Sequence, residues 1–261
     1  MFNEELIAAK VAARNAGKIL TKHLESYSQD IKYKKDSGHS PVTAADYEAD
    51  QYLASFLGSE FPHDGWLSEE TVDTYDRIDK KRVWIIDPLD GTKEFIQKIP
   101  EFCVSIGLVE NNIPVVGVIY NPISDEMFYA QKNQGAFLNA NQIRISTVQN
   151  IENASIVVSR SEKTKGLWNN YKSNFSSIKS VGSIAYKLGL AASGLYDVTA
   201  TVAPKNEWDI CAGDCIVNEA GGVMKKINGD NILYNQKKTL VTDPIIATNS
   251  ILFDNISDLL Y

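Results

Sequence analysis

The sequence is short of several features that would place it in other classes of protein. Its 261 residues hold 26 lysines and arginines against 33 aspartates and glutamates, a formal net charge of −7. Without a positive excess there is little to neutralise a phosphate backbone, so we expect no nucleic-acid polymer as a partner. No run of about 18 apolar residues occurs, so we expect no transmembrane helix.

Cysteine and histidine are scarce as well, with three residues of each. An odd number of cysteines in a chain of this length does not favour a disulfide framework. Cys211 and Cys215 lie four residues apart, which fits one face of a helix, but the histidines are too distant in sequence to suggest a zinc site. We therefore expect reduced cysteines that pack in the interior.

The amino-terminal segment lacks the basic start and the apolar block of a secretory signal. It begins Met-Phe-Asn-Glu-Glu and continues into an alanine-rich stretch. Such a start predicts a cytoplasmic protein, and it leaves peripheral association with the inner membrane open.

The patterns that are present predict a mixture of helices and strands. Hydrophobic periodicity and capping signals predict helices over 4–24, from Thr43 onward, over 183–192 and over 209–220, with a turn at 36–41. Short apolar runs predict strands at 83–86, 103–109, 115–120, 126–130, 155–159 and 245–248. The second, third and fourth of these strands read as an antiparallel meander. Because helices and strands are interleaved, we expect an α/β (α+β) fold with layered sheets and helices.

Acidic chemistry concentrates in residues 84–95, which read Trp-Ile-Ile-Asp-Pro-Leu-Asp-Gly-Thr-Lys-Glu-Phe. An apolar strand ends at Asp87, Pro88 stops it, and the resulting turn can bring Asp90 beside Asp87. Two carboxylates this close repel each other unless a cation lies between them. Mg²⁺ prefers oxygen ligands, to which the Leu89 carbonyl could be added. The simpler alternative is a surface turn, because Asp-Pro and Asp-Gly are common turn pairs.

The neighbouring positions add to this picture. Gly91 allows close backbone approach, and its N–H and that of Thr92 could bind phosphate oxygens, particularly if a helix begins there. Glu69-Glu70 precedes the strand, and Asp209 opens the helix over 209–220. Taken singly, the glutamates fit a solvated loop, while Asp209 fits a helix cap.

Taken together, these segments resemble the inositol monophosphatase superfamily of Mg²⁺-dependent, lithium-sensitive phosphatases. The resemblance covers the chain from about Pro41 to Gly222. Its motifs are Glu69-Glu70, then Asp87-Pro-Leu-Asp90-Gly-Thr92, then Trp208-Asp209 followed by Ala212-Gly213. It implies a layered α-β-α-β-α sandwich and about two or three Mg²⁺ ions in the active site.

The resemblance also implies a role for each residue. The metal ligands would be Glu69, Asp87, the Leu89 carbonyl, Asp90 and Asp209. Pro41-Val-Thr43-Ala-Ala-Asp46 resembles the family segment P-V-T-x-A-D, so Asp46 would join Thr92 as the catalytic pair that activates water. The substrate-binding residues would be Glu69, Leu89, Asp90, Gly91, Thr92, Ser183 and Asp209. For Ser183, a helix N-cap is the alternative role.

The substrate is a finer question. Gly91-Thr-Lys93-Glu94-Phe95 and Ser159-Arg160-Ser161 resemble the bacterial 3′(2′),5′-bisphosphate nucleotidase branch, which releases the 3′-phosphate of adenosine 3′,5′-bisphosphate. Two positions depart from that branch: Glu162 stands where it has histidine, and Tyr186 stands where it has a nucleotide-contacting lysine, with Lys187 next. An inositol-1-monophosphatase or related sugar monophosphatase is therefore the alternative.

Two alternatives come from other functional classes. A catalytically weak relative would bind a phosphate ester as a regulatory protein, and a two-carboxylate glycosidase would need no divalent metal, so it would stay active in EDTA.

Polar interruptions near 140–155 predict a division of the chain. The expected subdomains are 1–145, with the metal site of Glu69 and Asp87–Thr92, and 146–261, which contributes Asp209. A small phosphorylated metabolite is the expected partner, and a homodimer is the family-level expectation.

Overall fold

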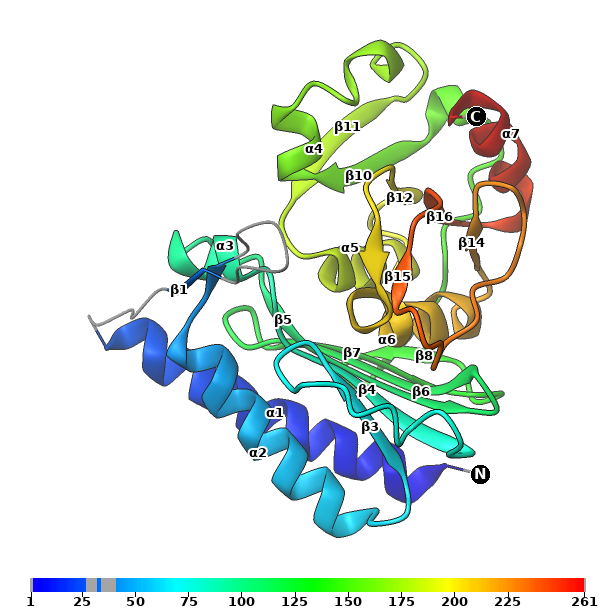
Figure 1. Cartoon of the computed structure of the whole chain (residues 1–261). Helices are drawn as coiled ribbons and strands as arrows, with labels where there is room; N and C mark the ends of the chain where they lie inside the picture. Colours follow the sequence, from blue (N-terminus) through cyan, green and yellow to red (C-terminus); the bar gives the residue numbers. More distant parts are fainter. Residues whose placement is uncertain (1, 27–31, 34–40, 261) are drawn as a thin grey trace.

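Helical layers and β-sheets alternate in the structure, a computed structural model that describes residues 2–26, 32–33 and 41–260. From bottom to top in Figure 1 the layers run helix, sheet, helix, sheet, helix. The two ends of the chain lie at opposite ends of this stack. The expected α-β-α-β-α sandwich is confirmed.

The first sheet holds seven strands within the described ranges, in the order β3-β4-β5-β6-β7-β8-β9. Their bounds are β3 (Gly65–Ser68), β4 (Arg82–Asp90), β5 (Cys103–Glu110), β6 (Ile113–Asn121), β7 (Glu126–Gln131), β8 (Ala136–Leu138) and β9 (Asn141–Ile143). β3 and β4 are parallel, and the later neighbours are antiparallel. The predicted meander of three strands is therefore confirmed as β5, β6 and β7.

The second sheet, as far as the structure describes it, has the strand order β11-β10-β12-β16-β14. Its strands are β10 (Ser155–Ser159), β11 (Ser177–Val181), β12 (Val198–Thr201), β14 (Val223–Lys226) and β16 (Ile245–Thr248). β10 is parallel to both β11 and β12, whereas β16 is antiparallel to β12 and β14. The short strands β1 (Lys32–Tyr33), β2 (Pro41–Val42), β13 (Lys205–Asn206) and β15 (Leu240–Val241) form two separate pairs.

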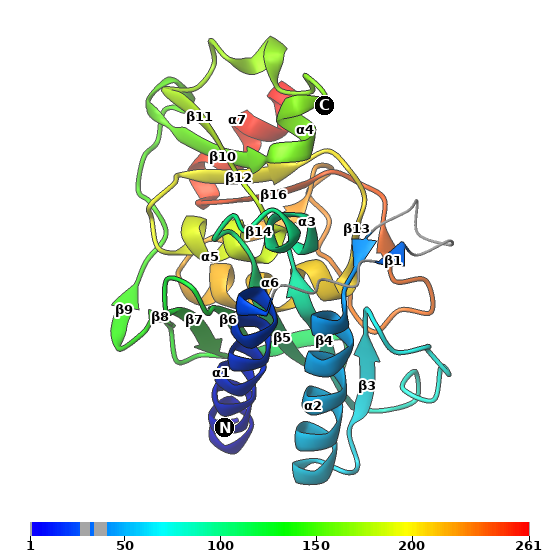
Figure 2. The same ribbon diagram turned by 90° about the vertical axis from the view of Figure 1, so that its left-hand side faces the viewer.

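The helices fill the three remaining layers. α1 (Asn3–Glu25) and α2 (Ala44–Glu60) lie side by side under the first sheet, as Figure 2 shows. α5 (Ile184–Ala192) and α6 (Glu207–Glu219) lie between the sheets, and α4 (Arg160–Thr164) and α7 (Ser250–Leu260) pack on the outer side of the second sheet. The remaining helical segments are α3 (Thr92–Ile96), η1 (Ile151–Asn153) and η2 (Asn169–Tyr171).

Alternation along β4 shows why the sandwich forms. Val83 and Ile85 join the core between the two sheets, whereas Trp84 and Ile86 join the core under α1 and α2. Side chains on a strand point alternately to opposite faces, so a strand that is apolar throughout must be covered on both sides. The predicted buried strand is confirmed, and the core between the sheets contains residues of both halves of the chain.

One local prediction about β4 is wrong. Pro88 does not end the strand, which continues to Asp90. Pairing with β3 ends at Ile86, and the register with β5 shifts between Asp87 and Asp90. Proline is tolerated at such an irregularity, because neither neighbour pairs with it there.

The helix predictions are confirmed, with one shift. α2 begins after Thr43, whose backbone N–H donates to Asp46 Oδ2 at 2.7 Å in a capping box. α6 begins at Glu207, two residues before the predicted start, because Asn206 and Asp209 form the capping box there. Asp209 therefore lies inside the first turn and does not open the helix.

Further expectations concern the cysteines, membrane-spanning helices, the turn at 36–41 and the division of the chain. The three cysteines are buried and unpaired, as expected. No helix in the described part of the chain has the length and apolar character that a membrane span requires. The turn predicted at 36–41 lies outside the described residues, apart from Pro41 in β2. The division into 1–145 and 146–261 stays a prediction.

Candidate active site

A cleft of about 270 Å³ opens where the end of β4 meets the first turns of α5 and α6. Eight of the residues predicted for the site line it. Those that line it are Glu69, Asp87, Leu89, Asp90, Gly91, Thr92, Ser183 and Asp209. Asp46, the remaining predicted residue, contacts Thr92 from α2. The fold thus brings together segments that are more than a hundred residues apart in the chain.

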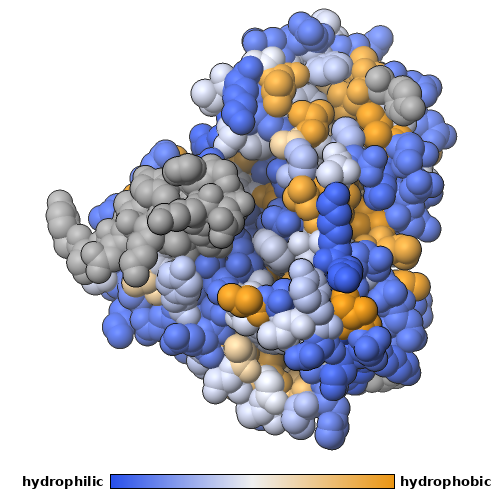
Figure 3. All heavy atoms as spheres, viewed as in Figure 1, coloured by the Kyte–Doolittle hydropathy of each residue, from blue (hydrophilic) through white to orange (hydrophobic). Residues whose placement is uncertain are grey.

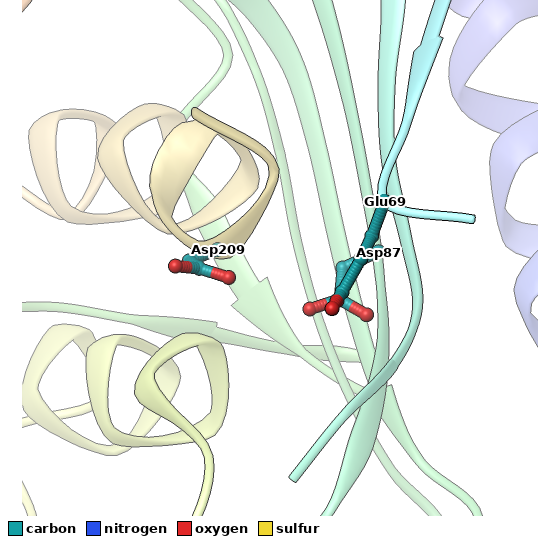
Figure 4. A group of neighbouring side chains, drawn as sticks. All are labelled: Glu69, Asp87 and Asp209. Atoms are coloured by element: carbon teal, nitrogen blue, oxygen red, sulfur yellow. The ribbon is translucent and has the colours of Figure 1, made fainter. Parts of the chain in front are cut away.

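Three carboxylates converge in this cleft. Glu69 directly follows β3, Asp87 lies in the parallel neighbour β4, and Asp209 reaches in from α6. Each offers one carboxylate oxygen, and these oxygens all lie within 4.8 Å of one another. Figure 4 shows Glu69 and Asp87 ending in the same space, with Asp209 opposite them on its helix.

Asp90 lies in the same cleft but stands apart from this cluster of three. Its Oδ2 accepts hydrogen bonds from Ser183 Oγ and from the backbone N–H of Ala185, each at 2.6 Å. Ser183 also caps α5, because its Oγ accepts from the backbone N–H of Tyr186. The helix N-cap, which was the alternative role for Ser183, is therefore confirmed, while its predicted contact with substrate stays a prediction.

Thr92 and Asp46 form a contact beside the carboxylates. Thr92 Oγ1 lies 3.3 Å from Asp46 Oδ1 and 3.2 Å from the Leu89 carbonyl oxygen. The other oxygen of Asp46 is held by the backbone N–H and hydroxyl of Thr43 at 2.7 and 2.6 Å. The capping box of α2 therefore fixes the carboxylate that faces Thr92.

Gly91 has a conformation that its neighbours require. Its φ is 98°, in the left-handed region, and it caps the short helix α3. A Cβ atom there would come within 2.9 Å of the Glu101 carbonyl oxygen. Glycine is therefore needed both for the turn and for the close approach of the chain.

Burial and mutual repulsion act together on the clustered acids. Burial raises the pKa of Asp87 well above its ordinary value, and the charges of Glu69, Asp90 and Asp209 raise it further. Burial, followed by the charges of Asp90 and Glu69, raises the pKa of Asp209 to about 8. A bound divalent cation would offset both effects, and an all-oxygen donor set fits Mg²⁺ better than a softer metal.

The cleft also has cationic residues that sequence reasoning did not assign to it. Lys93, Lys187 and Lys205 all line it. Lys187 is buried, and its Nζ donates to the Ser183 carbonyl oxygen at 2.6 Å; burial lowers its pKa to about 8. Its neighbour Tyr186 is instead turned toward β7, where its hydroxyl lies 2.5 Å from Glu126 Oε2. The nucleotidase branch has a lysine where this chain has Tyr186. The lysine at the next position, Lys187, was the sequence signal that could have identified a cationic residue of the cleft.

Glu162, the other departure from the nucleotidase pattern, is held by hydrogen bonds inside the protein. It is buried, and its carboxylate accepts from Trp168 Nε1 at 3.0 Å, Thr201 Oγ1 at 2.7 Å and the backbone N–H of Ala203 at 3.1 Å. Its neighbour Ser161 lines the cleft. Glu162 therefore ties α4 to β12 instead of contacting a ligand.

The surrounding surface is mainly hydrophilic on the face that Figure 3 shows, and its apolar side chains gather in separate patches. The cleft itself mixes acids with lysines and with the hydroxyl residues Ser159 and Ser161. Such a lining suits a small polar ligand, and an anion among these acids would need a cation between it and the carboxylates.

Comparisons with known proteins agree with this geometry. The inositol monophosphatase family model matches residues 3–256. An inositol monophosphatase of Mesembryanthemum crystallinum is 32% identical over 259 residues, covering 94% of this chain and 93% of that protein. The Nus factor SuhB of Pasteurella multocida is 31% identical, covering 94% of each. The crystal structure of the extragenic suppressor protein suhB from Bartonella henselae superposes with a TM-score of 0.86 at 30% identity, covering 99% of this chain and 98% of that one.

Proposed function

Since this chain belongs to the inositol monophosphatase family, we propose that its cleft is the active site of a Mg²⁺-dependent phosphatase acting on a small phosphorylated metabolite. The observation that carries the proposal is the convergence of Glu69, Asp87 and Asp209 within 4.8 Å. Membership in a family of phosphatases also removes the glycosidase alternative.

The proposed metal ligands are those expected from the sequence. Glu69, Asp87 and Asp209 would hold Mg²⁺, and Asp90 and the Leu89 carbonyl would complete about two or three sites. When bound, Mg²⁺ supplies positive charge that offsets the charge of the phosphate oxygens and lowers the pKa of a water. The raised pKa values of Asp87 and Asp209 support this assignment, because a cation would relieve the repulsion that raises them.

The remaining chemistry belongs to residues of the chain. Thr92 and Asp46 would orient the attacking water and take up its proton, since the hydroxyl lies 3.3 Å from the carboxylate. The backbone N–H groups of Gly91 and Thr92 are the donors that we expect to bind phosphate oxygens. Ser183 would contribute indirectly, through its hydrogen bond to Asp90.

For the substrate, an inositol monophosphate or a related sugar phosphate is the better supported choice. The relatives that cover most of this chain include proteins named inositol monophosphatase. Glu162 is buried among Trp168, Thr201 and Ala203, so it cannot take the place of a ligand-contacting histidine.

A bisphosphate nucleotide is the second candidate, and one observation favours it. Lys187 and Lys205 line the cleft beside Ser161, so positive groups are present for a second phosphate even though the expected lysine position holds tyrosine. Charge-assisted hydrogen bonds from such groups are the usual means of binding phosphate.

The decisive experiment is a phosphate-release panel with Mg²⁺. Inositol 1-phosphate, adenosine 3′,5′-bisphosphate and fructose 1,6-bisphosphate would each be assayed with and without Li⁺ and with EDTA. We expect turnover that needs Mg²⁺, is inhibited by Li⁺, and is fastest with inositol 1-phosphate. A clear preference for the bisphosphate nucleotide would support the second candidate.

The Asp209→Asn variant tests the proposed metal ligand, because it keeps an oxygen to cap α6 but removes a metal-binding charge. We expect it to lose nearly all turnover with its circular dichroism unchanged. Wild-type turnover in this variant would overturn the assignment. No turnover of any substrate by the wild-type protein, despite Mg²⁺ binding, would favour the regulatory alternative.

Two further predictions accompany the proposal. The cytoplasmic location and the homodimer remain expectations from sequence and family. Fractionation of cells that express the protein would test the location. Sedimentation of the purified chain would test the homodimer.

A further inference from the structure

The turn that precedes α5 contains a strained residue. Ser183 has φ 55° and ψ 127°, a combination outside the regions that non-glycine residues ordinarily adopt. Such a conformation persists only where the surrounding contacts determine it. Its place is at the wall of the cleft, directly beside Asp90.

Several hydrogen bonds join this turn to the cleft. Ser183 Oγ and the backbone N–H of Ala185 both donate to Asp90 Oδ2 at 2.6 Å. The backbone N–H of Gly182 donates to Glu101 Oε2 at 2.7 Å, and Glu101 is paired with Arg160. The conformation of the turn and the orientation of the Asp90 carboxylate are therefore coupled.

Lys187 holds the same turn from the interior. Its side chain is 2% exposed, and its Nζ donates to the carbonyl oxygens of Ser183 at 2.6 Å and Val181 at 3.3 Å. The backbone bond from Lys187 N to the same Ser183 oxygen is long, at 3.4 Å. The ammonium is thus the closer donor to the carbonyl of the strained residue.

The side chain of Lys187 is unusual for its surroundings. All nine residues of α5 are buried, and the others include alanine, leucine, isoleucine and glycine. Burying an ammonium is unfavourable unless its hydrogen bonds are satisfied. An apolar side chain could fill this space without that penalty, so the donors of Lys187 distinguish it from the rest of the helix.

We propose that Lys187 is a positioning residue of the metal site, which holds the strained turn at 181–183 so that Ser183 and Ala185 fix the orientation of the Asp90 carboxylate. The inference rests on the proposed function, because it takes Asp90 to be a metal ligand. Lys187 itself touches neither the metal nor the reacting atoms in this role.

The test measures Mg²⁺ binding to the full chain by calorimetry without substrate. Lys187→Met keeps the length of the side chain and removes its donors. Because partners that orient metal ligands usually affect metal affinity strongly, we expect binding weakened about ten-fold or more. Lys163→Met is the matched control: Lys163 Nζ also donates to a backbone carbonyl, that of Ile178 at 3.2 Å, but at an exposed site on α4. Its affinity should equal that of the wild type.

A second comparison separates positioning from general support of the fold. If Lys187 acts through Asp90, Lys187→Met should weaken binding in the wild-type background and add nothing to Asp90→Asn. Equal weakening in both backgrounds, or unchanged affinity in a folded Lys187→Met protein, would overturn the proposal. Lys187→Gln, which keeps a donor, is used if the methionine variant does not fold, and it should show an intermediate loss.

The readout keeps the two proposals distinct. A wild-type protein that binds Mg²⁺ but hydrolyses no phosphomonoester contradicts the proposed function, while the role of Lys187 is still decided by the binding data. A wild-type protein that binds no Mg²⁺ overturns both.

Discussion

At the scale of single residues, two acids of the cleft serve the backbone and the site at once. Asp46 Oδ2 accepts from Thr43 at the start of α2, and Asp209 Oδ2 accepts from the backbone N–H of Asn206 at 2.8 Å at the start of α6. Each has a second oxygen for other contacts. Helix capping and a role in the cleft are therefore complementary for these residues, and capping fixes the carboxylate in place.

The raised pKa of Asp209 leads to a prediction about pH. In the metal-free protein the folded state holds this proton up to about pH 8, whereas the unfolded chain releases it near the ordinary value of 3.8. Between these values the folded state binds more protons, so the free energy of unfolding falls as pH rises. Asp209→Asn, which does not titrate, should flatten this fall.

Thermal unfolding in EDTA from about pH 5 to about pH 8 would measure the difference between the two proteins. Asp214, whose pKa burial raises to about 7, is present in both and contributes the same trend to each. Parallel stability curves for wild type and variant would contradict the prediction.

At the scale of elements, the position of α6 depends on small residues beneath it. A Cβ at Gly107 would come within 2.6 Å of Cys211 Sγ, and one at Gly117 within 2.3 Å of the Ala212 carbonyl oxygen. Backbone cannot give way as a flexible side chain can. These glycines of β5 and β6 therefore let α6 approach the sheet closely enough to bring Asp209 to the cleft.

We expect Gly117→Ala to displace α6, because the added methyl group meets a backbone carbonyl. The variant should lose about 1–3 kcal/mol of stability in denaturant unfolding, and it should also bind Mg²⁺ more weakly. Gly58→Ala in α2 is the control, since nothing lies within 4 Å of a Cβ there. Its stability should stay equal or rise by up to about 1 kcal/mol. Equal stabilities for both variants would refute this account of α6.

Glu162 offers a second prediction at this scale. Glu162→Ala would leave the donors of Trp168, Thr201 and Ala203 without their acceptor, so we expect a loss of about 2–3 kcal/mol in urea unfolding. Glu152→Ala, at an exposed position of η1, should change stability by less than about 0.5 kcal/mol. A Glu162→Ala protein as stable as the wild type would show that these hydrogen bonds contribute little.

At the scale of the whole molecule, the site joins the two halves of the chain. Glu69 and Asp87 come from the first sheet, directly after β3 and within β4, whereas Asp209 comes from a helix that packs between the sheets. A metal held by all of them would connect the first sheet to α6, in addition to the apolar packing between the sheets and the hydrogen bond from Ser105 Oγ to the Trp208 carbonyl oxygen. Metal binding should therefore stabilise elements well beyond the cleft.

The prediction is that Mg²⁺ stabilises the whole protein. At a free concentration of about 100 times the dissociation constant, the gain should be about 2.7 kcal/mol. Hydrogen exchange should slow in β4 and in α6 together. The Asp209→Asn protein should gain much less from the same Mg²⁺ concentration, and protection confined to one of the two elements would contradict a shared site.

Local signals were sufficient for much of this molecule. The capping pair Thr43 and Asp46, the apolar run at 83–86 and the apolar runs of the meander are signals within a few residues, so they predicted elements that the structure confirms. The acidic motifs could also be identified from the sequence, because their residue types and order are read directly from the chain. Family and fold followed from these signals, and the comparisons confirm both.

By itself, then, the sequence determined four of the helices, six of the strands, the layered fold and the set of acidic residues at the cleft. Only the tertiary structure decided that Lys187 and not Tyr186 faces the cleft, that Glu162 is buried, and that β4 continues past Pro88. Neighbouring residues on a helix point in directions about 100° apart, so the packing of the whole helix selects which one lines the cleft. Contacts such as that between Asp90 and Ser183, 93 residues apart, exist only after the chain has folded.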